Sequence, residues 1–263
     1  MSAESEKLAE GTLISHLLEL RDRLLRAVIA VTLVFIPCAY WANEIFTFVS
    51  EPLKAKLPPG SSLLATHITS SFTVPFKLSF FVALFIAMPY VLYQVWSFVA
   101  PGLYKHEKRF ALPLLLSSIL LFYVGVGFAY KWVFPVIFNF FITAGPQELK
   151  VMPDISEFLD FALTMFFAFG VAFEVPIAVV LLAITGIVEV DTLKKARGYV
   201  LIGIFVIAAI LTPPDAVSQC IMGVPMYFLF EGGIIMATIL KKMQRKREAE
   251  EEAREKEGDK GDD

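Results

Sequence analysis

Cysteine and histidine are scarce in this sequence, and their scarcity excludes several kinds of protein. Cys38 and Cys220 are the two cysteines among 263 residues, and both lie within apolar runs. A disulfide framework is therefore not expected. The three histidines, His16, His67 and His106, lie far apart and lack the spacing of a metal site. We expect no metal ion and no other cofactor.

Charged side chains are also few, at 19% of the chain, and the formal net charge is −3. The bases form no strongly basic face of the kind that binds nucleic acid. What the sequence has instead is apolar surface: 57% of the residues are hydrophobic, 25 are Phe, and the mean hydropathy is +0.67. A soluble core of this length needs far less, so we expect an integral membrane protein.

Six apolar blocks predict an all-α, polytopic protein with six transmembrane helices, since a helical span needs about 20 residues. We expect residues 1–23 to form a cytoplasmic N-terminus, 24–240 the six-span membrane domain, and 241–263 a charged, solvated and partly disordered tail. The polar start lacks an A-x-A-like cleavage site, which favours a retained first span over a signal peptide. The blocks are Leu24–Ala42, Phe72–Leu103, Phe110–Phe134, Phe158–Thr185, Tyr199–Leu211 and Ala216–Leu240.

The distribution of Lys and Arg predicts the orientation. With six spans the two termini share a side, and that side carries most of the bases outside the spans. The positive-inside rule therefore places both termini in the cytoplasm. Lys77 and Lys131 lie near the outer ends of their spans, and we expect both to snorkel outward.

The fifth block is too short for an ordinary span. Tyr199–Leu211 offers about 20 Å of helix at 1.5 Å per residue, against a hydrocarbon core of about 30 Å. Pro213 and Pro214 end this helix, and Asp215 is placed to cap the next one. This hairpin either thins the bilayer locally or does not cross it fully.

Glu174 is an acid deep inside the fourth block, two residues before Pro176. A charged side chain at the centre of a membrane helix costs about 2.5–3.5 kcal/mol on insertion scales. Pro176 also leaves the carbonyl of Ala172 without its helical donor. Two interpretations stay open: a protonated Glu hydrogen-bonded inside the bundle, or a polar site that faces a water-filled cavity or a partner helix.

Two further carboxylates lie at the membrane edge on the side of the termini, each among bases. Glu19 is close to His16, Arg21 and Arg23, and Glu107 lies in the first cytoplasmic loop. On a helix Glu19 and Arg23 are four residues apart, which permits a simple intrahelical ion pair. Alternatively, the two carboxylates together accept two guanidinium groups from another chain.

At these residues the sequence resembles the TatC family, the multi-span subunit of the twin-arginine protein translocase. The resemblance extends from about Ser15 to about Leu240, and the combination of its motifs is specific. It is carried by S-H-L-L-E-L-R-D-R-L before the first span, Y-Q-V-W-S-F-V-A-P-G-L-Y-K-H-E from Tyr93, F-G through E-V-P from Phe169, L-T-P-P-D from Leu211, and P-M-Y from Pro225.

The resemblance implies a glove-shaped six-helix receptor, the last two spans short, that binds Arg-Arg signal peptides of folded export substrates and is not an enzyme. Its partners would be TatA-like and TatB-like single-span proteins, with self-association in a larger complex. It assigns signal-peptide binding to Glu19, Glu107, Arg21, Arg23, His16, Gln94 and Phe98, and assembly or partner contacts to Pro52, Glu174 and Asp215.

Two other classes of membrane protein have to be weighed against a signal-peptide receptor. A secondary transporter or ion channel with a buried Glu site is the alternative, although the two halves show no internal repeat or paired broken helices. An intramembrane hydrolase would need a nucleophile with a base, or H-E-x-x-H, and His106-Glu107 lacks the second His.

Overall fold

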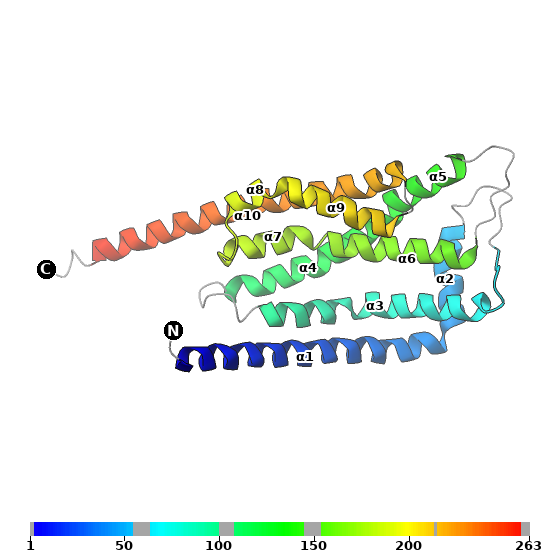
Figure 1. Ribbon diagram of the computed structural model, residues 1–263, viewed down its shortest axis with the longest axis horizontal. Helices are drawn as coiled ribbons and strands as arrows, with labels where there is room; N and C mark the ends of the chain where they lie inside the picture. Colours follow the sequence, from blue (N-terminus) through cyan, green and yellow to red (C-terminus); the bar gives the residue numbers. More distant parts are fainter. Residues whose placement is uncertain (1–2, 55–63, 100–107, 145–153, 213–214, 259–263) are drawn as a thin grey trace. The chain divides into compact units, whose positions relative to one another are not determined.

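A computed structural model describes residues 3–54, 64–99, 108–144, 154–212 and 215–258. Within these ranges the chain is almost entirely helical (Figure 1), and one isolated bridge joins Leu64 to Asp154. The helices are α1 (Ala3–Tyr40), α2 (Ala42–Lys54), α3 (Ser70–Val99), α4 (Lys108–Phe128), the π-helix η2 (Ala129–Val133), α5 (Phe134–Ala144), α6 (Ile155–Ala172), α7 (Val175–Ile184), α8 (Val190–Lys195), α9 (Arg197–Leu211) and α10 (Ala216–Gly258).

Five segments of the described chain are long and apolar enough to cross a membrane, and α9 is a shorter apolar helix of 15 residues. The expected all-α, polytopic architecture is confirmed, and each of the six apolar blocks is helical over most of its described residues. The five long segments are Leu17–Tyr40, Ser70–Phe98, Leu112–Phe141, Ile155–Ile184 and Ala216–Gln244.

The last helix corrects two expectations. Only α9 is short, because α10 has 43 residues and its apolar segment alone has 29. The helix also continues to Gly258, where the sequence suggested a partly disordered tail. The charged residues after Leu240 are mostly Lys, Arg, Glu and Ala, all strong helix formers, so a helix that has already begun can propagate through them.

The chain divides into two compact units, residues 1–120 with 130–166 and residues 121–129 with 167–263. In the first unit α1 and α3 run antiparallel side by side, and α2 packs on α3 (Figure 1). Edge-to-face contact of Phe35 with Phe80, at 5.8 Å between ring centroids, ties α1 to α3. Phe134 and Phe158, also in edge-to-face contact, are buried at the centre of a separate aromatic cluster.

The second unit depends on close backbone approaches at glycine. A Cβ on Gly170 would lie 2.6 Å from a ring carbon of Phe122, and one on Gly125 would lie 2.5 Å from the carbonyl oxygen of Phe169. A Cβ on Gly233 of α10 would lie 2.9 Å from the Cα of Pro176 in α7. Any larger residue would push these helices apart.

Candidate functional site

Glu19 lies on α1, and its motif is helical and continuous with the first membrane span. Its carboxylate pairs with Arg23 one turn later, so the intrahelical ion pair expected as one alternative is present. Two nitrogens of Arg23, Nε at 3.0 Å and Nη2 at 2.6 Å, donate to the same oxygen of Glu19, Oε1. Among the described residues nothing donates to Oε2, so the carboxylate keeps one oxygen for a further donor.

The packing of α1 on α3 sets the level of Glu19 along α3. Phe35 contacts Phe80, the helices are antiparallel, and each rises about 1.5 Å per residue. Glu19, 16 residues before Phe35, therefore lies close to the level of Trp96, between Gln94 and Phe98. The structure thus brings three of the residues singled out in the sequence to one level of one unit.

Gln94 is 4% exposed, and no donor in the described part of the chain reaches its Oε1 atom. Buried amide oxygens are normally hydrogen-bonded, so the partner of this atom is a water, a ligand or a residue outside the described ranges. Phe98 lies one turn later on α3 and is half-buried. Trp96 is buried at the same level, although the sequence analysis gave it no role.

The remaining candidates near this level are only partly described. Arg21 bonds its neighbour Asp22 and is exposed. Glu107 lies outside the described residues, so its expected place beside Glu19 stays a prediction. His16 lies in α1 and Pro52 in the last turn of α2, and the structure describes the backbone alone at these two residues.

Glu174 lies at a break in its membrane span. Helix α6 ends at Ala172 and α7 begins at Val175, so the span is interrupted just before Pro176. Glu174 occupies the N-cap position of α7 without capping it through its side chain, and its Oε1 atom is buried. The acid is held in the second unit, where residues 167–172 pack closely on Phe122 and Gly125.

Asp215 caps α10, as its position after the two prolines predicted. Its Oδ1 atom accepts a hydrogen bond from the backbone N–H of Ser218 at 2.7 Å. The Oδ2 atom of Asp215 and the hydroxyl of Ser218 are both buried, and no hydrogen-bond partner for either lies in the described residues. The start of α10 therefore presents a carboxylate oxygen and a hydroxyl group, to which a polar group outside the described residues can bond.

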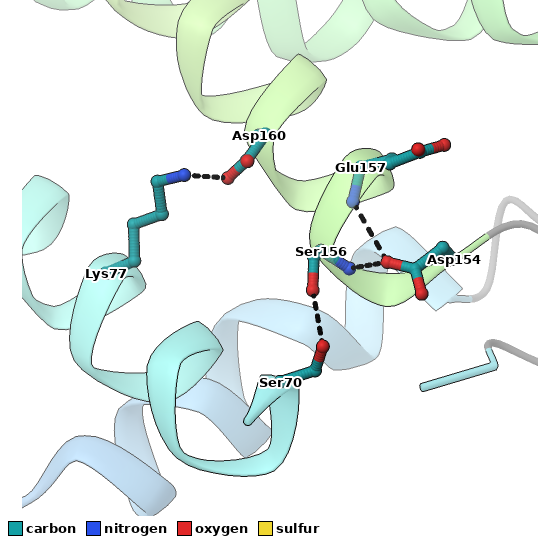
Figure 2. A network of polar contacts seen from close by, with 6 residues as sticks. All are labelled: Ser70, Lys77, Asp154, Ser156, Glu157 and Asp160. Carbon is teal, nitrogen blue, oxygen red and sulfur yellow. Dashed lines mark hydrogen bonds and ion pairs between the residues drawn. The ribbon is translucent and has the colours of Figure 1, made fainter. Parts of the chain in front are cut away.

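A polar network at the start of α6 was missed in the sequence (Figure 2). One oxygen of Asp154 caps α6 by accepting the backbone N–H of Ser156, and the other accepts both the hydroxyl and the N–H of Thr66. These bonds, the Thr66 hydroxyl first, hold the pKa of the Asp154 carboxyl well below its usual range. Ser156 also bonds Ser70 of α3 at 3.0 Å.

Lys77 pairs with Asp160 of α6 at 2.6 Å (Figure 2), and its outward snorkelling stays a prediction. Both side chains are about half exposed. Lys131, in η2, lies over the ring of Trp132 at 4.9 Å. The π-helix itself has no clear signal in the sequence, although such bulges often mark functional positions.

Glu231 is a second acid inside an apolar span that the sequence analysis did not single out. It lies on α10 and forms a two-pronged ion pair with Arg197 of α9, with both N–O distances 2.7 Å. The hydroxyl of Tyr227 donates to the same carboxylate at 3.0 Å. Its position in F-E-G-G, within an apolar span, was the available signal.

Comparison with known proteins decides the family of this chain. The family model described as Sec-independent protein translocase protein (TatC) matches residues 15–225. The chain belongs to the TatC family. A TatC protein of Azotobacter chroococcum mcd 1 is 53% identical over 234 residues, covering 89% of this chain and 92% of that protein. One from Escherichia coli K12 is 49% identical over 236 residues, covering 90% and 92%.

A solved structure agrees with the TatC assignment. The crystal structure of a protein named as the twin arginine translocase receptor TatC superposes with a TM-score of 0.77 at 36% identity, covering 85% of this chain and 98% of that one. As a TatC protein, the chain is a multi-pass membrane component of the twin-arginine translocase and has a transport role, not an enzymatic one.

Proposed function

We propose that this chain is the signal-peptide receptor of its translocase, and that Glu19 and Glu107 bind the two arginines of the signal. The observation that carries the proposal is the Oε2 atom of Glu19, to which no described residue donates, at the level of the Gln94 Oε1 atom, which has no partner among the described residues. An incoming guanidinium has five donors in a planar fork and can bond several such acceptors at once. Lys, with a compact ammonium group, cannot reproduce that geometry.

Arg23 has a defined role in this proposal. It occupies Oε1 of Glu19 and fixes the orientation of the carboxylate through two bonds. Each hydrogen bond to a charged group contributes about 1.5–3 kcal/mol net, so two carboxylate sites supply about 3–6 kcal/mol. That range discriminates Arg-Arg from Lys-Lys and still permits release of the signal. His16 and Arg21 would be further polar residues of the same binding site.

The apolar remainder of the signal would lie against Phe98 and the spans beyond it. We place both termini on the cytoplasmic side of the inner membrane, because most Lys and Arg residues outside the spans lie on the same side as the termini. The motif around Glu19 is then exposed to the compartment in which folded substrates with Arg-Arg signals are made.

The single-span partners would bind in other parts of the chain. Helix α9 carries a shallow apolar groove of about 400 Å³, lined by Leu201, Ile202, Phe205, Val206 and Ala209. We assign this surface to the membrane span of a TatB-like partner, since exposed apolar side chains on a membrane-embedded helix can pack against another span. Glu174 and Asp215 would supply polar contacts to TatA-like or TatB-like partners, and Pro52 would serve assembly and self-association.

The test is photocrosslinking and binding with an Arg-Arg signal peptide. Glu19→Ala and Glu107→Ala should each weaken binding at least tenfold, equivalent to about 1.4 kcal/mol, while membrane insertion stays intact. Glu44→Ala is the matched control, since Glu44 lies in the first turn of α2 at the opposite end of α1. Unchanged affinity in both single variants and in the double variant would contradict the proposal.

A further inference from the structure

The ion pair between Arg197 and Glu231 joins the first residue of α9 to the middle of α10. The guanidinium uses Nε and Nη2 on the two carboxylate oxygens, and the Tyr227 hydroxyl bonds one of the same oxygens. Glu231 is 21% exposed and Arg197 is 46% exposed. The carboxylate is thus held by two residues, one from each helix, in the planar two-pronged geometry that only Arg provides.

The two partners meet because they lie equally far from the turn that joins their helices. Arg197 is 14 residues before Leu211, and Glu231 is 15 residues after Ala216. At 1.5 Å per residue both lie about 21–22 Å from the turn. The antiparallel course of α9 and α10 (Figure 1) then brings them to one level.

Helix α10 is itself anchored on α7 next to this level, and α9 packs on α10 nearer the turn. Gly233, two residues after Glu231, allows the backbone of α10 to lie against Pro176 and Val179 of α7. Nearer the turn, Gly223 allows the ring of Phe205 to lie against α10, where an added Cβ would be 3.3 Å from the ring. Because α10 is fixed on α7, whatever fixes α9 on α10 also fixes α9 in the unit.

The level of the pair is far from the charged end of α10. Nine uncharged residues, Gly232–Leu240, separate Glu231 from Lys241, which is about 14–15 Å of helix. A helix as short as α9 could lie centred in the bilayer, so that each of its ends falls a little short of the nearer edge of the hydrocarbon core. An ion pair at its first residue removes that freedom, so that the whole difference in length between α9 and the hydrocarbon core lies on the Arg197 side.

We propose that Arg197 and Glu231 are positioning residues that set the depth of α9 in the membrane, and with it the depth of the apolar groove on α9. The part that concerns the groove rests on the partner docking proposed above. Tyr227 holds the Glu231 carboxylate in the rotamer that receives Arg197. The depth of α9 is a property of this chain alone and can be measured without any partner.

The experiment places a nitroxide at position 199, whose native Tyr is 82% exposed, after replacement of Cys38 and Cys220 by Ser. Its depth is measured by oxygen and nickel accessibility in reconstituted bilayers. Arg197→Gln and Glu231→Gln should each move the label toward the headgroups by at least two residues of helix, about 3 Å. The charge-swapped pair Arg197→Glu with Glu231→Arg should restore the original depth.

The matched control is Lys194→Gln, which removes one positive charge from the same region but breaks only the exposed pair with Asp191 on α8. It should leave the label at its original depth. If a single variant fails to accumulate, the charge-swapped variant decides: restored accumulation with restored depth supports the proposal, and failure to restore either overturns it. An unchanged label depth in both single variants also overturns it.

A second measurement separates this proposal from the receptor function. Cysteine crosslinks from positions 202 and 206 to a TatB-like span should shift by about one turn in the single variants and return in the charge-swapped pair. Signal-peptide binding, which depends on Glu19, should be unaffected in all of them. Loss of signal binding with unchanged depth would contradict the depth proposal and leave the receptor function standing.

Discussion

Two antiparallel helix pairs, α1–α3 in the first unit and α9–α10 in the second, use charge in opposite ways. In the α1–α3 pair the apolar segments have 24 and 29 residues, so Glu19 and Lys77 lie near the ends of their spans. In the α9–α10 pair one helix has 15 residues, so its terminal Arg197 meets its partner at the middle of a span. In the full-length pair Glu19 bonds Arg23 on its own helix, whereas in the truncated pair the charged residues of the two helices bond each other.

The largest effect is expected from changing the length of α9. Insertion of about six Leu after Val206 adds about 9 Å of helix and moves Arg197 away from the level of Glu231. Export of a folded Arg-Arg substrate should fall at least a hundredfold, while signal-peptide binding is kept, because Glu19 is in the other unit. Transport assays on membrane vesicles and peptide binding measure the two effects.

The control for this insertion is the same six Leu placed in α1 after Val34, in the full-length pair. That variant should accumulate poorly or lose signal binding, since the contact between Phe35 and Phe80 changes register relative to Glu19. Full export by the lengthened α9 would show that its short length has no role.

A smaller effect is expected where α10 lies against α7. Gly233→Leu should reduce the stability of the second unit by about 1–3 kcal/mol, because its side chain would overlap the backbone of Pro176. Gly232→Leu is the matched control one residue away, where an added Cβ meets nothing within 4 Å. Thermal unfolding in detergent should separate the two variants, and equal melting temperatures would contradict the close approach.

Glu174 provides a test of whether the second unit also holds a charge for a partner. We expect Glu174→Ala to accumulate normally, because removal of an ionisable group from a span lowers its insertion cost. Its export should fall at least tenfold, because the proposed polar contact with a partner is lost. Glu174→Gln should keep part of the activity by hydrogen bonding. Failure of Glu174→Ala to accumulate in the membrane would instead assign the residue a structural role within the break between α6 and α7.

Residues that act along one helix could be predicted from the sequence, and residues that meet across helices could not. The spans follow from apolar length, and the cap at Asp215 follows from the two prolines before it. The pair of Arg197 with Glu231 depends on the antiparallel register of α9 on α10, which no local pattern encodes. Asp154 and Thr66 are 88 residues apart in sequence, so their contact was equally hidden.

The smallest effect is expected at Asp154, where the first unit uses a charge structurally as α9–α10 does. Its carboxylate caps α6 and holds Thr66, and these bonds lower its folded-state pKa below the unfolded value. A lowered folded-state pKa stabilises the fold at every pH above the unfolded pKa of about 3.9, and the stabilisation is lost as the pH falls below it. The contribution should therefore be constant from pH 8 to about pH 5 and decline only in stronger acid.

Asp154→Asn should lower the melting temperature of the detergent-solubilised protein by a few degrees at pH 7, and the difference from the parent should shrink on titration toward pH 3. Thr66→Val removes one hydroxyl donor and keeps the backbone donor, so it weakens the same carboxylate without deleting it. Its stability at pH 7 should be lower than that of the parent, and its acid loss should begin at the same pH but be smaller and complete at a higher pH, because the folded-state pKa is then less depressed. A melting difference for Asp154→Asn that is the same at pH 7 and pH 3 would show that the side chain acts by shape and hydrogen bonding alone, and that its charge contributes nothing to holding Thr66 against α6.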